Sequence, residues 1–316
     1  MPQSNEKRIK ELLRDPLGRA ALERELGISI TLPEERLLMP FEKPPAIVAV
    51  LVPCYDHPDP AMTDAYYKVT DHARKHTKAE IWPVPQKSAS IITWVRNNLV
   101  QSLLSTRRAW THALWWDDDI VPPTDALTKL LSHNKDVIVG LCTCRTDPPV
   151  PNIRYWRADN NRYEEIIGWE DGLVEVGAGG TGFMLVTKRA LQEVAEAYFT
   201  CQVEKDLYGM PTELALEVGG KRRAHFDETG NCLWFRCLPY AQGYGEMGED
   251  VSFCHVLRHY RGIKTYCDTT VQPDHVGKYE FGIKDFVPYR DSWIKEAKNA
   301  GHFVAKKEES TKVVTQ

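Results

Sequence analysis

Three consecutive carboxylates, Asp117, Asp118 and Asp119, stand where a dense apolar run ends at Trp116 and two prolines follow shortly after. Such a run, bounded by residues that break regular structure, predicts a buried strand with the acids at its carboxyl end. On an extended backbone, Asp117 and Asp119 would point to the same side. Two carboxylates placed in this way can bind a divalent cation together with substrate phosphates. The alternative explanation is an acidic turn or the start of the next helix.

A second pair of acids, Glu249 and Asp250, follows Gly248 and opens an amphipathic stretch that ends at Gly262. This pattern predicts a helix with both carboxylates in its first turn, where they could simply compensate the helix dipole. A positioned carboxylate could instead remove the proton of a substrate hydroxyl. Because a helix N-terminus favours the charged form, such a base must gain its strength from burial or from bound substrate.

Two further features could contribute to a ligand site. His275 follows Asp274, and it is either a metal ligand or a hydrogen-bonded structural histidine. Residues 177–182 contain four glycines in six positions, which suits either a hairpin loop or a backbone that approaches a sugar or phosphate closely. Their spacing matches neither the phosphate-binding loop of nucleotide hydrolases nor the dinucleotide-binding fingerprint.

The elements that must position these residues alternate between strand and helix. Strands are predicted over 46–52, 79–84, 110–116 and 136–141, with helices over 63–76 and 90–105. This alternation predicts an α/β fold with a mainly parallel central sheet and helices on both faces. Residues 150–170 are rich in aromatic side chains and predict a loop or short antiparallel strands. Trp156, Tyr163 and Trp169 in this stretch could stack on sugar rings.

Three regions are predicted within the 316 residues. Residues 1–44 form an N-terminal helical extension and linker, 45–290 the main domain, and 291–316 a C-terminal helix with a charged tail. The net charge of −4 gives the whole chain no electrostatic footprint for nucleic acid. No apolar run approaches the ~20 residues of a membrane-spanning helix, and the first residues lack a signal peptide's apolar core, so a cytoplasmic protein is expected.

Taken in order, these features resemble the GT-A glycosyltransferases, especially the family 2-like group. The match spans roughly residues 46–280 and leaves 1–44 and 200–230 outside. The segments that carry it are Pro53-Cys54-Tyr55-Asp56 after the first strand, Arg96-Asn97-Asn98, Asp117-Asp118-Asp119, the stretch 180–185, the stretch 248–254, and His275-Val276-Gly277.

The resemblance implies a Rossmann-like GT-A fold, a nucleotide-sugar donor such as a UDP- or GDP-sugar, and Mn²⁺ or Mg²⁺. Asp117 and Asp119 would match the Asp-x-Asp motif: Asp119 binds the metal directly, and Asp117 holds ribose or reaches the metal through water. His275 would complete the metal site. Asp250, or failing that Glu249, would be the base of an inverting transfer. The donor would be held by Pro53, Cys54, Tyr55, Asp56, Arg96, Asp117, Asp118, Gly180, Thr181 and Gly182.

Two other functions stay open. A nucleotidyltransferase or sugar-nucleotide pyrophosphorylase also uses a nucleotide-binding α/β sheet, but such enzymes usually carry a basic, glycine-rich loop after the first strand. Here residues 53–57 contain neither Lys nor Arg. A catalytically inactive sugar-nucleotide-binding module is the second alternative. The acceptor is also open among a glycan, a protein and a modified nucleic-acid base, of which the acidic net charge favours the last least.

Overall fold

A computed structural model describes residues 45–54, 57–87, 91–146, 149–200, 203, 231–240 and 245–276, with short pieces at 282–284, 286–287, 290 and 294–295. Tyr55, Asp56 and Gly277 lie outside the described residues. So do the predicted extension 1–44 and all but two residues of the predicted tail 291–316. The three predicted regions therefore stay predictions.

A seven-stranded sheet forms the centre of the described chain, in the order β2-β1-β3-β10-β5-β13-β8. Strands β2, β1, β3, β5 and β13 run parallel, whereas β10 and β8 run antiparallel to their neighbours. The predicted α/β class with a mainly parallel sheet is therefore confirmed. The strands span β1 Ile47–Cys54, β2 Glu80–Lys87, β3 His112–Trp116, β5 Val137–Gly140, β8 Leu173–Val176, β10 Phe183–Thr187 and β13 Thr265–Asp268.

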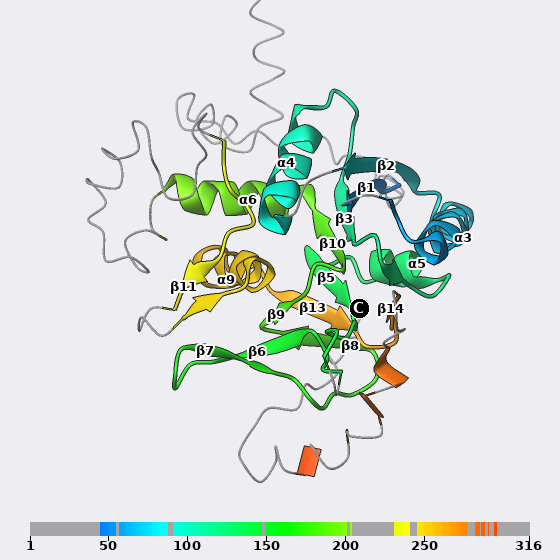
Figure 1. Ribbon diagram of the computed structural model, residues 1–316. Helices are drawn as coiled ribbons and strands as arrows, with labels where there is room; N and C mark the ends of the chain where they lie inside the picture. The colour runs from blue at the N-terminus through cyan, green and yellow to red at the C-terminus, as the bar shows by residue number, and fades with distance from the viewer. Residues whose placement is uncertain are drawn as a thin grey trace, which may run out of the picture. The chain divides into compact units, whose positions relative to one another are not determined.

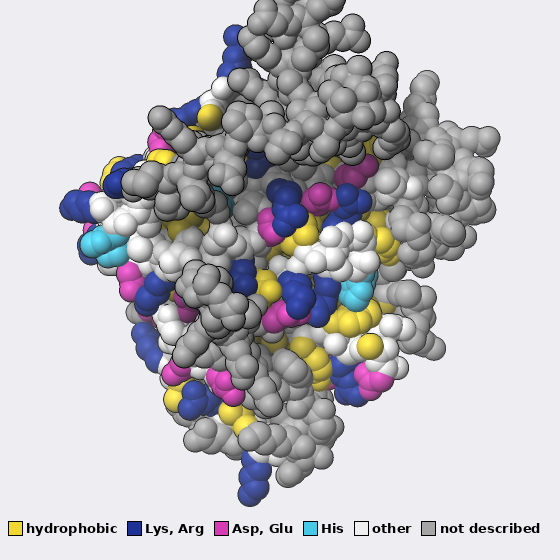
Figure 2. All heavy atoms as spheres, turned by 180° about the vertical axis from the view of Figure 1, so that it is seen from behind, with side chains coloured by type: hydrophobic (Ala, Val, Ile, Leu, Met, Phe, Trp, Pro, Cys, Tyr) yellow, Lys and Arg dark blue, Asp and Glu magenta, His cyan; other side chains and the backbone are white. Residues whose placement is uncertain are grey.

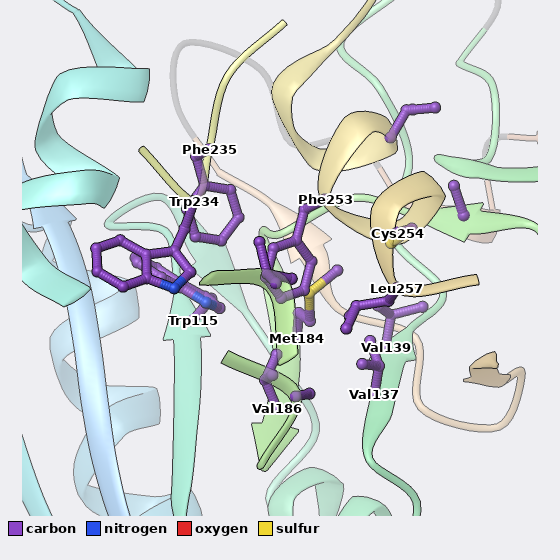
Figure 3. Close-up of a cluster of buried hydrophobic side chains, with 14 of the residues drawn as sticks. Trp115, Val137, Val139, Met184, Val186, Trp234, Phe235, Phe253, Cys254 and Leu257 are labelled. Atoms are coloured by element: carbon purple, nitrogen blue, oxygen red, sulfur yellow. The ribbon is translucent and has the colours of Figure 1, made fainter. Parts of the chain in front are cut away.

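Helices cover both faces of this sheet, as predicted (Figure 1). Helices α3 (Pro60–Thr77) and α5 (Ala126–Ser132) pack into one apolar core, and α4 (Ile92–Ser105), α6 (Lys188–Phe199) and α9 (Glu249–Arg261) pack into the other. Figure 3 shows this second core, where Phe253 and Leu257 of α9 lie over Val139 and Met184 of the sheet.

Strand β1 shows why both faces must be covered. Val48 and Val50 enter the core under α3, while Ala49 and Leu51 enter the core under α4. Successive side chains of a strand point to opposite faces of the sheet, so a strand of apolar residues has an apolar side chain on both faces. Such a strand is stable when helices cover both faces. The near-continuous hydrophobic run in the sequence is thus a direct sign of a central strand.

The first strand ends two residues later than predicted, because Pro53 and Cys54 pair with Gln86 and Lys87 of β2. Pairing of β1 with β3 ends at Leu51. Beyond Leu51, no described strand pairs with this edge of β1. A proline, which has no amide hydrogen, is tolerated at such an unpaired edge. Both side chains are buried, and Cys54 packs in the core under α3.

The aromatic segment forms a second, smaller sheet made of β6 (Ile153–Arg157), β7 (Arg162–Glu165) and β9 (Ala178–Gly179). The short antiparallel strands expected here are confirmed. The side chains expected to stack on sugars are mostly buried, with Tyr163 6% and Trp169 9% exposed. Trp156 lies partly buried against Tyr163 and His259, at centroid distances of 4.9 and 4.7 Å. Aromatic rings on this sheet therefore extend the core.

Two short strand pairs complete the described structure: β11 (Leu238–Pro239) with β12 (Glu246–Met247), and β4 (Ile120–Val121) with β14 (Asp274–His275). In the part of the chain that the structure describes, no helix is long and apolar enough to cross a membrane. Figure 2 shows basic side chains interspersed with acidic ones on one face, in keeping with 40 Lys and Arg residues against 44 Asp and Glu residues.

Candidate functional site

The candidate site lies at the carboxyl ends of the parallel strands, where open α/β sheets bind ligands. Helices α4 and α9 each precede a parallel strand, β3 and β13 respectively, so the first turn of each helix starts at this same edge. Arg96 stands near the start of α4, and Glu249 and Asp250 open α9. The topology therefore brings all three side chains toward the acids that follow β3.

The three acids form a turn and not the extended segment that was expected, so the alternation of side chains along a strand does not apply to Asp117 and Asp119. The amide of Ile120 donates to the carbonyl of Asp117 at 3.2 Å, and the carbonyl of Asp118 accepts from the amide of Asp59 at 2.9 Å. The chain must turn here because β4, which begins at Ile120, pairs with β14 outside the main sheet. Asp117 and Asp119 consequently meet different partners.

Asp117 is held by a buried arginine. The Nη2 atom of Arg96 lies 3.1 Å from each carboxylate oxygen of Asp117, and its Nη1 atom donates to Glu249. Only 6% of the Arg96 side chain is exposed. Although burial lowers the pKa of this guanidinium, the charges of Asp117 and Glu249 raise it above its usual value. Arg96, predicted to hold the nucleotide, thus joins the acid turn to the start of α9.

Neighbouring contacts fix Arg96 and its helix in place. Asn97 uses both ends of its amide on one residue: Nδ2 donates to the carbonyl of Phe235 at 2.8 Å, and Oδ1 accepts from the Phe235 amide at 2.9 Å. Phe235 in turn stacks on Phe253 of α9. Helices α4 and α9 are therefore also connected through Phe235, which makes a polar contact with α4 and an aromatic contact with α9.

Asp119 lies next to His275, and these two residues are predicted to share a metal ion. The Nδ1 atom of His275 lies 2.6 Å from the carbonyl oxygen of Thr143, and since a carbonyl only accepts, Nδ1 must carry the proton. In the neutral ring, Nε2 then has a free lone pair, and it lies 3.8 Å from Oδ1 of Asp119. Metal-binding histidines are commonly oriented by this type of second hydrogen bond.

Arg145, which sequence reasoning missed, also reaches Asp119. Its Nη2 atom donates to the second carboxylate oxygen of Asp119 and, at 2.8 Å, to the carbonyl oxygen of Val276. Nearly half of the side chain, 46%, is exposed. The signal available in the sequence was its position: Arg145 follows β5, whose carboxyl end lies at the ligand-binding edge.

Two carboxylates of the site, those of Asp119 and Asp250, differ in pKa from ordinary surface carboxylates. Burial raises the pKa of Asp119, with the charges of Asp117 and Asp118 adding to it and Arg145 and His275 acting against it. Burial also raises the pKa of Asp250, and the neighbouring charge of Glu249 adds to this effect. Both carboxylates are therefore stronger proton acceptors than free aspartate.

The glycine-rich segment is neither a hairpin nor an open cradle. Strands β8 and β10 on either side of it are not neighbours in the sheet, and β9 within it pairs with β6. A Cβ on Gly177 would lie 2.7 Å from the backbone nitrogen of Trp156, and one on Gly180 would lie 2.3 Å from the amide nitrogen of Asn152. Because a Cβ on Gly177 would meet backbone, close packing requires this glycine, whereas a Cβ on Gly180 would displace the side chain of Asn152.

Gly182 of this segment contacts the acid turn, and Thr181 precedes Gly182 in the chain. The carbonyl of Gly182 accepts from the amide of Asp117 at 3.0 Å, and a Cβ on Gly182 would lie 3.7 Å from Oδ2 of Asp117. Thr181 is 1% exposed, and among the described residues its hydroxyl has no hydrogen-bond partner.

Asp119 and His275 have the chemistry to hold a divalent cation. Two atoms that are each about 2.1 Å from one cation are at most about 4.2 Å apart, so the 3.8 Å separation is compatible with a shared ion. Among the described residues, no group of three or more His, Cys, Asp or Glu side chains could hold a metal ion. Mg²⁺ often takes only one or two protein carboxylates and completes its shell with water and substrate phosphates. Of this pair, Asp119 supplies the oxygen ligand that such a cation prefers, whereas the imidazole of His275 is a ligand more typical of transition-metal ions.

Comparisons with known proteins assign no family to the chain. No protein-family model matches it, and no curated protein does. Among solved structures, a glycosyltransferase involved in the glycosylation of the major capsid of PBCV-1 is 11% identical, with a TM-score of 0.27, and the match covers 54% of this chain and 75% of that one.

Two other solved structures are similar at the same level. The 4-diphosphocytidyl-2C-methyl-D-erythritol synthase from Anaerococcus prevotii is 6% identical with a TM-score of 0.27, covering 50% of this chain and 78% of that one. The nucleoside-diphosphate-sugar pyrophosphorylase from Vibrio cholerae RC9 is 8% identical with a TM-score of 0.34, covering 71% and 91%. Similarities this low do not transfer an activity.

Proposed function

We propose that this chain is a metal-dependent glycosyltransferase of the GT-A type, which moves a sugar from a UDP- or GDP-sugar to an acceptor hydroxyl with inversion. The observation that carries the proposal is the meeting of Asp119 with Nε2 of His275 at the ligand-binding edge of the sheet. These residues come from separate segments, and the hydrogen bond from Nδ1 of His275 to the carbonyl of Thr143 leaves the lone pair of Nε2 available for the proposed metal ion.

Asp250 is the proposed base for the acceptor hydroxyl. A base at a helix N-terminus is expected to be weak, because the helix dipole favours the charged carboxylate. Burial and the charge of Glu249 act in the opposite direction and raise the pKa of Asp250. Glu249 is already paired with Arg96. We therefore assign proton transfer to Asp250 and a supporting role to Glu249.

The metal would be held by Asp119 and His275, with Asp117 contributing through water. A bound Mn²⁺ or Mg²⁺ would neutralise the negative charge that develops on the leaving nucleoside diphosphate. Asp118 lies in the acid turn, Gly182 contacts it, and Thr181 precedes Gly182; all three are proposed to contact the donor. The buried hydroxyl of Thr181 suits this role, since it has no partner among the described residues.

The nature of the products separates this function from its alternatives. UDP- and GDP-sugars would be supplied with Mn²⁺, and the nucleotide products identified by chromatography. A glycosyltransferase releases the nucleoside diphosphate, by slow hydrolysis if no acceptor is present. A pyrophosphorylase forms a nucleoside triphosphate only when pyrophosphate is added, and an inactive module binds the donor without turnover.

Chelation provides the matched test of the metal. EDTA should abolish release of the nucleoside diphosphate, and Mn²⁺ or Mg²⁺ added in excess should restore it. Full turnover in the presence of chelator would remove Asp119 and His275 from the proposed metal site.

A further inference from the structure

Arg145 has no task in the reaction as proposed so far, although it contacts the carboxylate on which that reaction depends. Its guanidinium is shared between Asp119 and the carbonyl of Val276, the residue after His275. It therefore lies on the same two segments that would hold the metal.

A cation and Arg145 compete for Asp119. One carboxylate oxygen of Asp119 accepts from Arg145, and the other lies 3.8 Å from Nε2 of His275. A divalent ion bound between Asp119 and His275 would place two positive charges next to the guanidinium, and like charges at such distances repel. The ion also withdraws charge from the carboxylate that holds Arg145. Metal binding thus weakens the contact between Arg145 and Asp119.

Release of Arg145 costs little, which makes an exchange of partners feasible. Its side chain is 46% exposed, and exposed ion pairs contribute little to stability. The bond to the Val276 carbonyl does not involve Asp119, so a guanidinium that leaves the carboxylate remains beside His275. A donor diphosphate on the metal would arrive next to it.

We propose that Arg145 is a diphosphate-binding residue that rests on Asp119 until a divalent cation takes its place, and that it then pairs with the phosphate oxygens of the nucleotide. This inference rests on the proposed function. The planar guanidinium matches phosphate oxygens with two parallel hydrogen bonds. It also supplies a positive charge beside Asp119, in a turn whose three carboxylates repel a diphosphate. Arg96 has both of its terminal nitrogens on carboxylates already.

The test measures two affinities of the full-length Arg145→Gln variant by calorimetric titration. Mn²⁺ alone should bind about 3- to 10-fold more tightly than to the wild type, because a competing cation is gone. UDP and GDP, titrated with Mn²⁺ saturating, should bind about 10-fold or more weakly, the range expected for loss of a hydrogen bond between charged groups. A merely structural residue would not move the two affinities in opposite directions.

Two further variants complete the design. Arg157→Gln removes an arginine that pairs with Asp159 on the small sheet, and it should change neither affinity. Arg145→Lys keeps the charge without the planar fork, so Mn²⁺ should bind as in the wild type and the diphosphate with an affinity between those of the wild type and Arg145→Gln.

Other outcomes would overturn the inference. Equal losses of both affinities in Arg145→Gln, or no change in either, would do so while leaving the metal site of the wild type intact. A wild-type chain that binds neither Mn²⁺ nor a nucleoside diphosphate would instead overturn the proposed function, and Arg145's role with it.

Discussion

The two ends of the acid turn are held by arginines in opposite ways. At Asp117, Arg96 comes from a helix, is 6% exposed, and also binds Glu249. At Asp119, Arg145 comes from a loop after β5, is 46% exposed, and shares its guanidinium with a backbone carbonyl. The same pair of residue types thus forms a buried bridge at one end and an exposed contact at the other.

This difference indicates that the contact at Asp117 is rigid and that the contact at Asp119 is easier to rearrange. Removal of one partner from a buried ion pair leaves an uncompensated charge in a poorly solvated place, whereas an exposed partner is replaced by water. Arg96 therefore sets the distance between the acid turn and α9. At the other end, the exposure of Arg145 is what would allow the proposed exchange of Arg145 for a metal ion on Asp119.

The largest expected effect is on stability. Arg96→Ala should lower the free energy of unfolding by about 3–5 kcal/mol, since it leaves the carboxylates of Asp117 and Glu249 unpaired. Arg145→Ala is the matched control and should lower it by less than ~1 kcal/mol. Urea unfolding of both variants measures the contrast, and equal losses would show that the two ends do not differ.

The next effect is on catalysis at the Arg96 end. Asp250→Asn keeps the shape of the side chain but not its proton affinity, so sugar transfer at saturating donor should fall by ~10² or more. Donor affinity and Mn²⁺ affinity should survive. Glu249→Gln should be less damaging to transfer, because Glu249 supports the site through Arg96. Near-normal transfer by Asp250→Asn would exclude Asp250 as the base and remove the reason for proposing inversion.

His275→Ala addresses the Asp119 end. If His275 is a metal ligand, Mn²⁺ affinity should fall about 10-fold or more, since even residues that only orient metal ligands have effects of that size. A histidine that serves only as a hydrogen-bond donor to Thr143 would behave differently: the melting temperature would fall while the Mn²⁺ affinity of the folded protein stayed the same. One titration and one thermal melt distinguish the two.

The smallest effect concerns pH and the raised pKa of Asp250. A carboxyl group whose pKa is higher in the folded than in the unfolded chain favours folding at low pH, and this contribution is lost as pH rises through the folded value. Asn mimics the protonated form at every pH. Asp250→Asn should therefore gain stability relative to the wild type at neutral pH, and this gain should disappear below the ordinary pKa of aspartate. Urea unfolding of both proteins at several pH values measures this gain, and a gain that does not depend on pH would contradict this account.

Local patterns in the sequence determined much of the architecture. The continuous apolar run of β1 predicts a central strand, and the acidic start and Gly262 end of α9 mark its boundaries. The position of Asp117 to Asp119 after β3 follows from the apolar run and the prolines around them. Each of these features depends on residues close together in the chain, where periodicity and capping act.

The site's contacts were decided by the tertiary structure. Arg96 and Glu249 are 153 residues apart in sequence, and Arg145 and Asp119 are 26 apart. Their pairing depends on the order of the strands, which places β10 between β3 and β5. The same order excludes a hairpin, one of the two alternatives for residues 177–182, because β8 and β10 are not neighbours. Pairing of β4 with β14 turns the chain at Asp117 and carries His275 to Asp119. Local propensity does not encode these contacts, because they form only when distant segments pack.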